Sequence, residues 1–405
     1  MKILQINNLY NSGSTGKITY DIHRFLLAEG IDSVVCYGRG EKTRDANVYK
    51  VCGEFYSHVC HFFCNLTGLM YGYCGLSTGK LLSLIEKEKP DLVHLQCVNG
   101  YFVNIYKLIE FLNKKRIPTV LTLHAEFMHT ANCGHALECE RWKTGCGQCP
   151  RFKQETQSYF FDRTAESWRR MKDAFAGFDL LRVVSVSPWL MDRAKASPIL
   201  GDKQHSVIYN GLNTGIFKEK DTAGLREEFG IALDTKIVFH ATPHFSAAAD
   251  HLKGGCYVIE AARRMPDVHF LVAGRHDEGM ELPPNMTLLG NIADQDRLAD
   301  MYCLADVTLL TSVRETFSMI CAESLSCGTP VVGFKAGAPE QISLKEYSSF
   351  CDYADMDALV ENLRAWLVRG KDRQIGQAAK DAYSAENMAS QYLRLYQSFL
   401  KDVKR

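Results

Sequence analysis

The stretch from residue 307 to residue 340 constrains the fold most, because two apolar segments flank a helix within it. Val307–Leu310 is an apolar run typical of a buried strand, and Pro330–Gly333 predicts a second one. Between them a helix opens at Thr316–Met319 and ends near Gly328, where glycine can adopt the left-handed conformation that caps a helix. Polar residues gather at the carboxyl end of the first strand. Open α/β sheets bind ligands at this edge.

Two carboxylates, Glu315 and Glu323, lie around the start of this helix. A helix start offers free backbone amides that suit an anionic diphosphate, and a carboxylate one to two turns in can accept the hydroxyls of a ribose. The pattern therefore predicts a nucleotide site. An ordinary helix with two solvated glutamates fits the spacing equally well, because such pairs are common. The residues with candidate amides are Thr316, Phe317, Ser318 and Met319.

The residues around the two glutamates also carry a family resemblance. The pattern E-x7-E, followed by S-C-G-T-P-V-V and G-A-P-E, resembles the signature of retaining glycosyltransferases of family 4. The resemblance implies the GT-B fold, an α/β architecture of two Rossmann-like domains that face each other across a deep cleft. It further implies that Glu315 is a catalytic residue beside the donor sugar and that Glu323 binds the ribose of the donor.

The length of the chain, 405 residues with 46% hydrophobic, is normal for two domains. A strand at Ser206–Tyr209 followed by Asn210-Gly211 resembles the interdomain crossing of GT-B enzymes. We therefore predict an acceptor domain at 1–212, a donor domain at 213–384 and a last helix at 385–405 that crosses back to the first domain. The apolar residues of this helix recur at helical spacing; they are Met388, Tyr392, Leu395, Tyr396 and Phe399.

Charge and cysteine content bear on the location of the protein. Residues 1–205 contain 26 Lys and Arg against 20 Asp and Glu, whereas residues 206–405 contain 21 against 27. A basic first half suits an anionic partner or a membrane surface, although a random imbalance explains it equally well. The aromatic stretch Phe55–Leu76 predicts a partly buried helix and loop, not a membrane span. Fifteen cysteines without a secretory signal predict reduced thiols in a cytoplasmic protein, with peripheral contact at the membrane as a further option.

A glycine-rich loop, Asn7–Lys17, follows the first predicted strand. It does not fit an ATP-binding P-loop, because Asn11 and Ile18 occupy positions that require glycine and Ser or Thr. In GT-B enzymes the similar loop approaches the donor diphosphate and the acceptor. The resemblance thus assigns donor binding to Gly13, Gly16 and Lys17.

Two further segments of the first half resemble acceptor-side motifs of the family. Gln96–Asn104 resembles the loop that faces the acceptor, with Gln96 in place of the usual His and with Asn99 beside it. The strand Thr119–Leu123 ends at His124, and a His at such an edge is commonly structural. However, T-L-H resembles the family's T-L-H-D, whose His contacts the transferred sugar. The Asp is missing here, and Glu126 could substitute for it.

The loop after the strand Lys236–His240 resembles the family's phosphate-binding segment, which has Arg and Lys five residues apart. Lys253 in K-G-G matches the Lys, whereas Ala248 occupies the position of the Arg. His244 or His251 could compensate in part, and Lys253 could instead be a plain surface lysine. Farther along, Gly274 and Arg275 end a predicted strand at the edge where the base or ribose commonly lies.

Four cysteines lie within seventeen residues in the pattern C-x5-C-x6-C-x2-C, a spacing that can surround one structural zinc ion. Two disulfides or four free thiols are the alternatives. The segment E-R-W-K-T-G-C-G-Q-C-P resembles a subgroup of family 4 associated with colanic-acid-type and capsular polysaccharides. The residues that follow, Phe152–Phe178, predict one long helical region. The candidate ligands are Cys133, Cys139, Cys146 and Cys149.

Together these features predict a retaining, hexosyl-type glycosyltransferase that uses a UDP- or GDP-sugar. The expected acceptor is a glycan or a polyprenyl-diphosphate-linked sugar in bacterial surface polysaccharide synthesis, such as capsule, exopolysaccharide or lipopolysaccharide. Catalysis is expected to need no cofactor, and no nucleic acid is expected as a partner. Two alternatives stay open. One is a non-catalytic subunit of a glycosyltransferase complex, and the other is a nucleotide-sugar epimerase on the GT-B scaffold.

Overall fold

The computed structural model describes residues 1–404. The chain divides into two compact units. Unit 1 comprises Met1–Tyr209 together with the chain from Met388 onward, and unit 2 comprises Asn210–Asn387. The corresponding sequence prediction placed these boundaries at 212 and 385.

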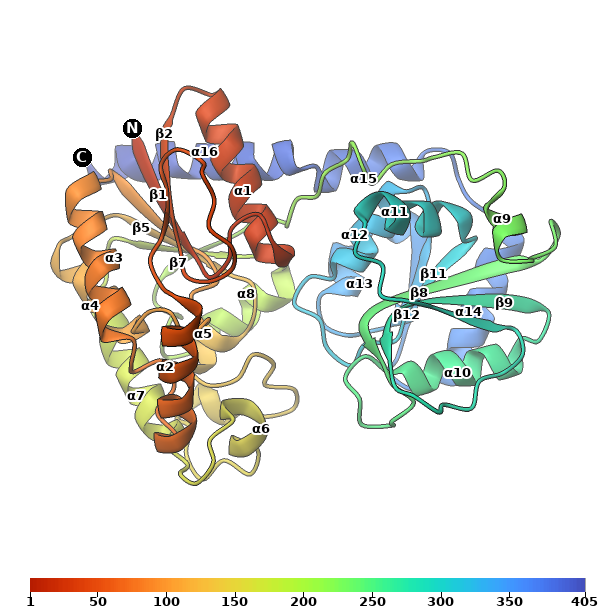
Figure 1. The fold of residues 1–405 in the computed structure, drawn as a ribbon, viewed down its shortest axis with the longest axis horizontal. Helices are drawn as coiled ribbons and strands as arrows, with labels where there is room; N and C mark the ends of the chain where they lie inside the picture. Colours follow the sequence, from red (N-terminus) through yellow and green to blue (C-terminus); the bar gives the residue numbers. More distant parts are fainter. Residues whose placement is uncertain (405) are drawn as a thin grey trace. The chain divides into compact units, whose positions relative to one another are not determined.

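Unit 1 is built on a seven-stranded sheet in the order β3-β2-β1-β4-β5-β6-β7, with parallel pairing throughout (Figure 1). Its strands are β1 (Lys2–Asn7), β2 (Asp32–Tyr37), β3 (Val48–Lys50), β4 (Leu92–Leu95), β5 (Thr119–Leu123), β6 (Leu181–Ser185) and β7 (Gln204–Val207). Its helices are α1 (Gly13–Ala28), α2 (Glu54–Thr67), α3 (Gly75–Glu88), α4 (Ile105–Lys114), α5 (Phe127–Thr130), α6 (Phe152–Thr156), α7 (Thr164–Phe175), α8 (Pro188–Lys195) and most of α16 (Ala385–Val403), with the 3-10 helix η1 (Arg141–Lys143).

Unit 2 contains a six-stranded parallel sheet in the order β10-β9-β8-β11-β12-β13. Its strands are β8 (Lys236–Phe245), β9 (Val268–His276), β10 (Met286–Gly290), β11 (Val307–Leu310), β12 (Val331–Phe334) and β13 (Ser348–Cys351). Its helices are α9 (Leu225–Glu228), α10 (Gly255–Arg264), α11 (Gln295–Leu304), α12 (Met319–Ser326), α13 (Pro339–Ile342), α14 (Met356–Arg369) and α15 (Ile375–Tyr383), with the 3-10 helix η2 (Lys345–Tyr347).

Both sheets follow from the sequence pattern. The central strands are continuous apolar runs because helices cover both faces of a parallel sheet, and every residue of β5 and β11 is buried. Several helices begin at capping residues; the Asn104 side chain accepts from the amide of Lys107 at the start of α4, for example. Two parallel α/β units of this kind are the Rossmann-like domains that the sequence predicted.

In each unit the strand order reverses once, between β1 and β4 in unit 1 and between β8 and β11 in unit 2. The loops that leave such a pair of strands diverge to opposite faces of the sheet, so the carboxyl edge at this switch point is open to a ligand. In unit 1 the loop after β1 leads to Gly13, and β4 is followed by Gln96. In unit 2 the loop after β8 contains Lys253, and β11 is followed by Glu315. The fold therefore places the predicted residues at two switch points.

Helix α16 packs against the sheet of unit 1. Its buried side chains join a core that includes Ile3, Ile18 and Leu92, and Tyr396 hydrogen-bonds through its hydroxyl to Nδ1 of His94 at 2.7 Å. Four of the five residues of the predicted apolar stripe are buried and Leu395 packs beside them. The buried members are Met388, Tyr392, Tyr396 and Phe399.

Some elements differ from the sequence prediction. Strand β8 continues to Phe245, and the edge strands β3 and β13 were not predicted. The region 152–178 is two helices, not one, because Gln157 adopts a left-handed conformation (φ 55°) that ends α6. The loop 157–163 then leads to α7. Among the described residues, no helix combines the length and the apolar character that a membrane crossing requires.

Candidate active site

The switch point of unit 2 brings together a lysine and a carboxylate that are far apart in sequence. Lys253 Nζ donates to Glu315 Oε1 at 2.6 Å, and their side chains are 29% and 15% exposed. Both residues were predicted as catalytic from separate motifs. Their contact forms a polar centre at the carboxyl edge of the sheet, still accessible from solvent.

The backbone around Glu315 is fixed by the glycine turn that follows β12. The amide of Glu315 donates to the carbonyl of Ala336, and its carbonyl accepts from the amide of Ala338. The Glu340 carboxylate in turn accepts from the amides of Ala336 and Gly337 at 3.0 and 3.1 Å. The G-A-P-E motif thus holds the segment that carries Glu315.

Lys253 is held by close packing of the chain at the start of α10. The backbone carbonyl of Lys253 accepts from Thr311 Oγ1 at 2.9 Å. Gly254 has φ 63°, and a Cβ atom there would lie 2.3 Å from the carbonyl oxygen of Thr311. Only glycine fits this close approach, so the K-G-G sequence is required to bring the lysine beside β11.

The loop from Thr316 to Ser318 precedes helix α12, which begins at Met319 rather than at Thr316. Ser318 has φ 82° and ψ 90°, a strained conformation for a residue with a side chain. Such strain clusters at functional sites, and here it turns the backbone at the position predicted to bind the diphosphate. Phe317 is buried, and its ring centroid lies 6.4 Å from that of Tyr383.

Glu323 lies within α12 and accepts a hydrogen bond from the hydroxyl of Tyr302 at 3.0 Å. Tyr302 is fully buried in α11, and burial together with the charge of Glu323 raises its pKa, so that it stays a donor. Tyr302 was not predicted from the sequence, because an aromatic residue in an amphipathic helix indicates only core packing. The contact orients the carboxylate that was predicted to hold the ribose.

The other predicted donor-side residues of unit 2 lie on neighbouring strand ends. Gly274 has φ 141°, and a Cβ there would lie 2.1 Å from the carbonyl oxygen of Thr242. This glycine is thus required by the packing of β9 against β8, while Arg275 is exposed beside it. His244 contacts Asp277 at 2.7 Å, and its ring lies 5.7 Å from that of His251. His244, one of the two histidines considered as a substitute for the missing arginine, thus already has a carboxylate partner.

In unit 1 the predicted glycine loop forms the start of α1. Gly13 has φ 63°, and Gly16 packs against Leu9, where a Cβ would meet its atoms at 3.2–3.3 Å. The carbonyl of Gly16 accepts from the amide of Asn11 at 3.0 Å, which closes the loop. Lys17 is partly exposed on α1. The positive charge of Lys17 opposes the rise in the pKa of Asp21, which burial takes to about 6.

His124 is held by a chain of glutamines across the switch point. Its Nε2 lies 3.1 Å from Gln96 Oε1, and Gln96 Nε2 donates to Gln5 Oε1 at 3.0 Å. Gln96 is buried, so it positions His124 instead of facing an acceptor. Desolvation lowers the pKa of His124 to about 4, and the imidazole is therefore neutral near pH 7. Asn99 lies nearby, where its side chain accepts from the Cys97 thiol at 2.8 Å.

Glu126, which was predicted as an acceptor-side residue, lies in the interior of unit 1. Its side chain is fully buried, forms an ion pair with Arg193 and accepts from the amide of Ala136 at 2.7 Å. Burial alone would raise the pKa of Glu126, but contacts with His129 and the charge of Arg193 outweigh it, so the pKa is lowered. The carboxylate therefore anchors the start of the cysteine-rich segment.

In this structure the four cysteines of that segment are not grouped as metal ligands, and the predicted zinc site stays a prediction. Among residues 1–404 no group of three or more His, Cys, Asp or Glu side chains is arranged to hold a metal ion, and all four thiols are free. Burial raises the pKa of Cys146 to about 11. Cys133 packs beside Trp142 and Ala136 instead. The cysteines concerned are Cys133, Cys139, Cys146 and Cys149.

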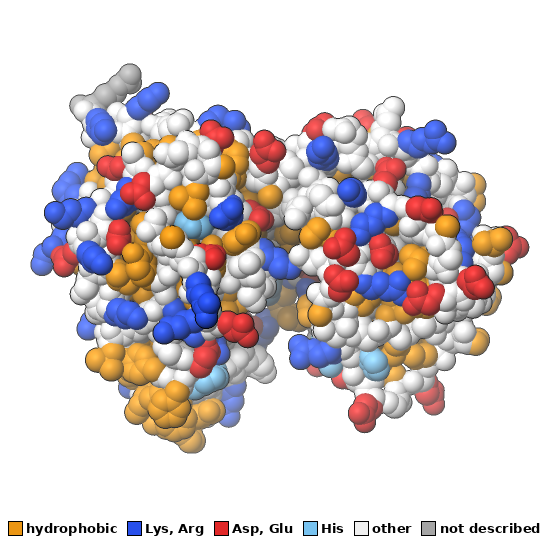
Figure 2. Space-filling view, turned by 45° about the horizontal axis from the view of Figure 1, so that its top comes forward, with side chains coloured by type: hydrophobic (Ala, Val, Ile, Leu, Met, Phe, Trp, Pro, Cys, Tyr) orange, Lys and Arg blue, Asp and Glu red, His pale blue; other side chains and the backbone are white. Residues whose placement is uncertain are grey.

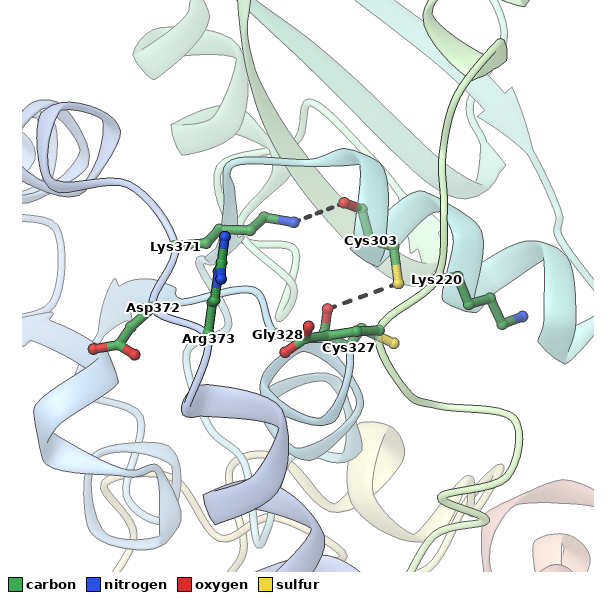
Figure 3. A pocket seen from close by; sticks show the side chains of 8 residues that line it. Lys220, Cys303, Cys327, Gly328, Lys371, Asp372 and Arg373 are labelled. Carbon is green, nitrogen blue, oxygen red and sulfur yellow. Dashed lines mark hydrogen bonds between the residues drawn. The ribbon is translucent and has the colours of Figure 1, made fainter.

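A separate cavity of about 180 Å³ lies at the far end of α12, away from Glu315 (Figure 3). Lys371 Nζ donates to the carbonyl of Cys303 at 2.6 Å, and Cys303 Sγ donates to the carbonyl of Cys327 at 3.7 Å. Burial lowers the pKa of Lys371. Since a lysine at a helix C-terminus satisfies free carbonyls, the lysine has a structural role at the end of α11. None of the predicted site residues lines this cavity.

Two known family models match this chain. The family model described as glycosyltransferase family 4 matches residues 15–215, and that described as glycosyl transferases group 1 matches residues 226–382. The chain belongs to glycosyltransferase family 4. It is thus an enzyme that transfers a sugar, and the predicted glycosyltransferase family is confirmed.

This glycosyltransferase is similar to the putative colanic acid biosynthesis glycosyl transferase WcaC of Escherichia coli, with 20% identity over 98% of this chain and 100% of that protein. The match supports the colanic-acid-type subgroup. Among solved structures, sucrose-phosphate synthase of Thermosynechococcus elongatus has a TM-score of 0.66 at 16% identity, covering 99% and 100% of the two chains. HepE of Anabaena in complex with UDP and glucose has a TM-score of 0.61 at 17% identity, covering 98% and 100%. These likenesses confirm the GT-B fold.

Proposed function

We propose that this glycosyltransferase transfers a hexosyl group from a nucleoside diphosphate sugar with retention of anomeric configuration. The contact between Lys253 and Glu315 at the switch point of unit 2 carries the proposal. A retaining transfer of this type needs cationic stabilisation of the departing diphosphate, with the acceptor hydroxyl attacking on the same face of the sugar. Lys253 supplies the cation, and the amides before α12 supply preorganised donors. Because these groups bear the charge, the proposed reaction requires no metal ion or other cofactor.

The other predicted residues have matching roles in the proposal. Glu323, oriented by Tyr302, binds the hydroxyls of the ribose. His124 is neutral and contacts the transferred sugar as a hydrogen-bonding group, not as a cation. The family resemblance also assigns donor binding to the loop with Gly13, Gly16 and Lys17.

We propose a UDP-sugar or a GDP-sugar as donor. HepE, the structural neighbour, was solved with UDP, with UDP and glucose, and with UDP-glucose, which favours the uridine nucleotide. As acceptor we propose a glycan or a polyprenyl-diphosphate-linked sugar of surface polysaccharide synthesis. The names of two relatives, one in colanic acid biosynthesis and one a lipopolysaccharide outer core galactosyltransferase, support this class. Such an acceptor requires the cytoplasmic enzyme to work at the membrane face.

The test has two stages. Thermal unfolding with a panel of nucleotide sugars identifies the donor, because a ligand that binds the folded state raises the melting temperature. Transfer to lipid-linked acceptors from membrane extracts, followed by NMR of the product, then gives the anomeric configuration. We expect retention, and activity unchanged by a metal chelator. An inverted product would overturn the mechanism. Conversion of the donor alone into an isomer would show the epimerase alternative instead.

A further inference from the structure

The most unusual surface of the protein lies on unit 1, where six aromatic side chains are exposed. Three lie on α2 and three in the loop between α6 and α7. Figure 2 shows hydrophobic side chains gathered at the lower end of this unit. We call this surface the aromatic patch; its members and exposed fractions are Phe55 (83%), Phe62 (51%), Phe63 (44%), Tyr159 (48%), Phe160 (67%) and Phe161 (54%).

Helix α2 exposes an apolar face, which contributes three side chains to the aromatic patch. Phe55, Phe62 and Phe63 recur at a helical spacing of seven and eight residues and therefore share one face. The opposite face of α2 is buried through Ser57, Cys60 and neighbouring residues. A soluble helix normally exposes its polar face, so the exposed apolar face of this helix is unusual.

Five of the six rings of the aromatic patch form a continuous chain of contacts across the two elements. The ring centroids of Phe62 and Phe63 are 5.8 Å apart, and those of Phe62 and Tyr159 are 6.4 Å apart. Tyr159 and Phe160 follow at 6.1 Å, and Phe160 and Phe161 at 6.2 Å. Contiguous exposed apolar area of this kind marks an interaction site.

Hydrogen bonds and close backbone packing hold α2 and the loop together, so the aromatic patch is a defined surface. The amide of Tyr159 donates to the carbonyl of Asn65 at 2.8 Å, and His61 Nε2 lies 2.9 Å from Gln157 Oε1. At Gly68, a Cβ would lie 2.3 Å from the carbonyl oxygen of Phe161. The glycine that ends α2 is therefore the residue that lets the loop come close.

The charge of unit 1 indicates what the aromatic patch contacts. The sequence of unit 1 contains 30 Lys and Arg against 21 Asp and Glu, whereas that of unit 2 contains 17 against 26. Lys153 and Arg163, which flank the loop in the sequence, are exposed, and Arg163 lies 3.5 Å from Glu166. Aromatic side chains prefer the interface of a bilayer, and basic residues are attracted to anionic lipids by about 1 kcal/mol each. A protein partner would not require the positive charge of the whole unit.

We propose that the aromatic patch docks unit 1 on the surface of an anionic lipid bilayer. Phe and Tyr rings enter the headgroup region, and the basic residues of the unit contact lipid phosphates. The proposal rests on the proposed function in one respect, since a lipid-linked acceptor lies in the same membrane. It names the surface that would bring the enzyme to that acceptor.

The test is co-sedimentation of the full chain with vesicles of phosphatidylcholine and phosphatidylglycerol. We expect wild-type protein to bind these vesicles, and to bind pure phosphatidylcholine or high-salt samples several-fold more weakly. Replacing Phe62 and Phe160 by Ser should reduce binding tenfold or more. The matched control replaces Leu233 and Val368 by Ser, because these side chains are 88% and 90% exposed on unit 2. Control binding should equal that of the wild type.

Two further measurements separate this proposal from its competitors. Calorimetry with the nucleoside diphosphate should give the same affinity for the Phe62→Ser, Phe160→Ser protein as for the wild type. Vesicle binding without nucleotide binding would support docking and overturn the donor site. Nucleotide binding without vesicle binding would overturn docking alone. Sedimentation velocity provides the second check. A wild-type dimer that the two substitutions convert to a monomer, with no binding to vesicles, would show that a second copy covers the aromatic patch.

Discussion

Lys253 and Glu315 lie 2.6 Å apart through Nζ and Oε1, on loops that leave the two strands of the unit 2 switch point. The carboxylate compensates the lysine charge while no diphosphate is bound. When a donor binds, the ammonium group can contact the Glu315 carboxylate on one side and the diphosphate on the other. The carboxylate therefore sets the position of the lysine before the substrate arrives. This preorganisation matters more here because Ala248 replaces the second cation of the family pattern.

Lys253→Ala should therefore lower turnover about a hundredfold or more, since no arginine shares the diphosphate charge. Steady-state transfer assays with the identified donor measure the effect. Lys335→Ala is the matched control, because Lys335 is an exposed lysine of the same unit that pairs with Asp352. It should retain wild-type turnover. Equal rates for Lys253→Ala and wild type would mean that the diphosphate binds elsewhere.

The fold was largely predictable because its central strands are continuous apolar runs. β5 and β11 were found with their observed bounds, Thr119–Leu123 and Val307–Leu310. The edge strands β3 and β13 were missed, since V-Y-K and S-S-F-C are short and carry little periodic signal. The loop 157–163 was missed because its three aromatic residues look like helix core in a sequence, whereas the structure exposes them.

The site was predictable only where a motif carried it. Glu315, Glu323 and Lys253 came from spacing and family pattern, and the contact of Lys253 with Glu315 depends on the fold alone. Tyr302 gave no signal, because its hydroxyl partner is twenty-one residues away on another helix. The internal ion pair of Glu126 was not predicted, since a sequence cannot show that a carboxylate next to a motif is paired internally.

Glu323→Ala should weaken binding of the nucleoside diphosphate roughly ten- to hundredfold, because hydrogen bonds to a charged acceptor contribute about 1.5–3 kcal/mol each. Tyr302→Phe should weaken it less, since the carboxylate stays but loses its orienting partner. Titration calorimetry gives both affinities. If Glu323→Ala binds as tightly as wild type, the ribose assignment fails.

His124 should make stability depend on pH in the acidic range. Its pKa is about 4 in the folded state and 6.5 when exposed, because burial disfavours the imidazolium. Between these values the unfolded chain binds a proton that the folded chain does not, so stability falls as pH drops from 6.5 towards 4. His124→Gln should reduce this loss and leave stability near pH 7.5 less affected. Urea unfolding of both proteins across this range measures it, and parallel curves would contradict the pKa argument.

The cysteine-rich segment calls for a direct metal measurement. The spacing of the four cysteines predicts about one zinc per chain in protein purified without a metal column, and loss of most of it in Cys149→Ser. Metal-free protein with four titratable thiols after unfolding would contradict the zinc interpretation. Absence of all four titratable thiols would favour disulfides and contradict a reducing compartment.

Glu126→Ala should destabilise unit 1 without weakening nucleotide binding. The substitution leaves Arg193 without its buried partner and frees the amide of Ala136, and loss of one member of a buried ion pair costs roughly 3–5 kcal/mol. Glu140→Ala is the control, because Glu140 forms an exposed pair with Lys143 and should leave stability close to that of the wild type. Urea unfolding gives the stability, and calorimetry with the nucleoside diphosphate gives the affinity. A stable Glu126→Ala protein that binds donor but transfers no sugar would return Glu126 to the acceptor site, since only a residue that contacts substrate could produce that combination.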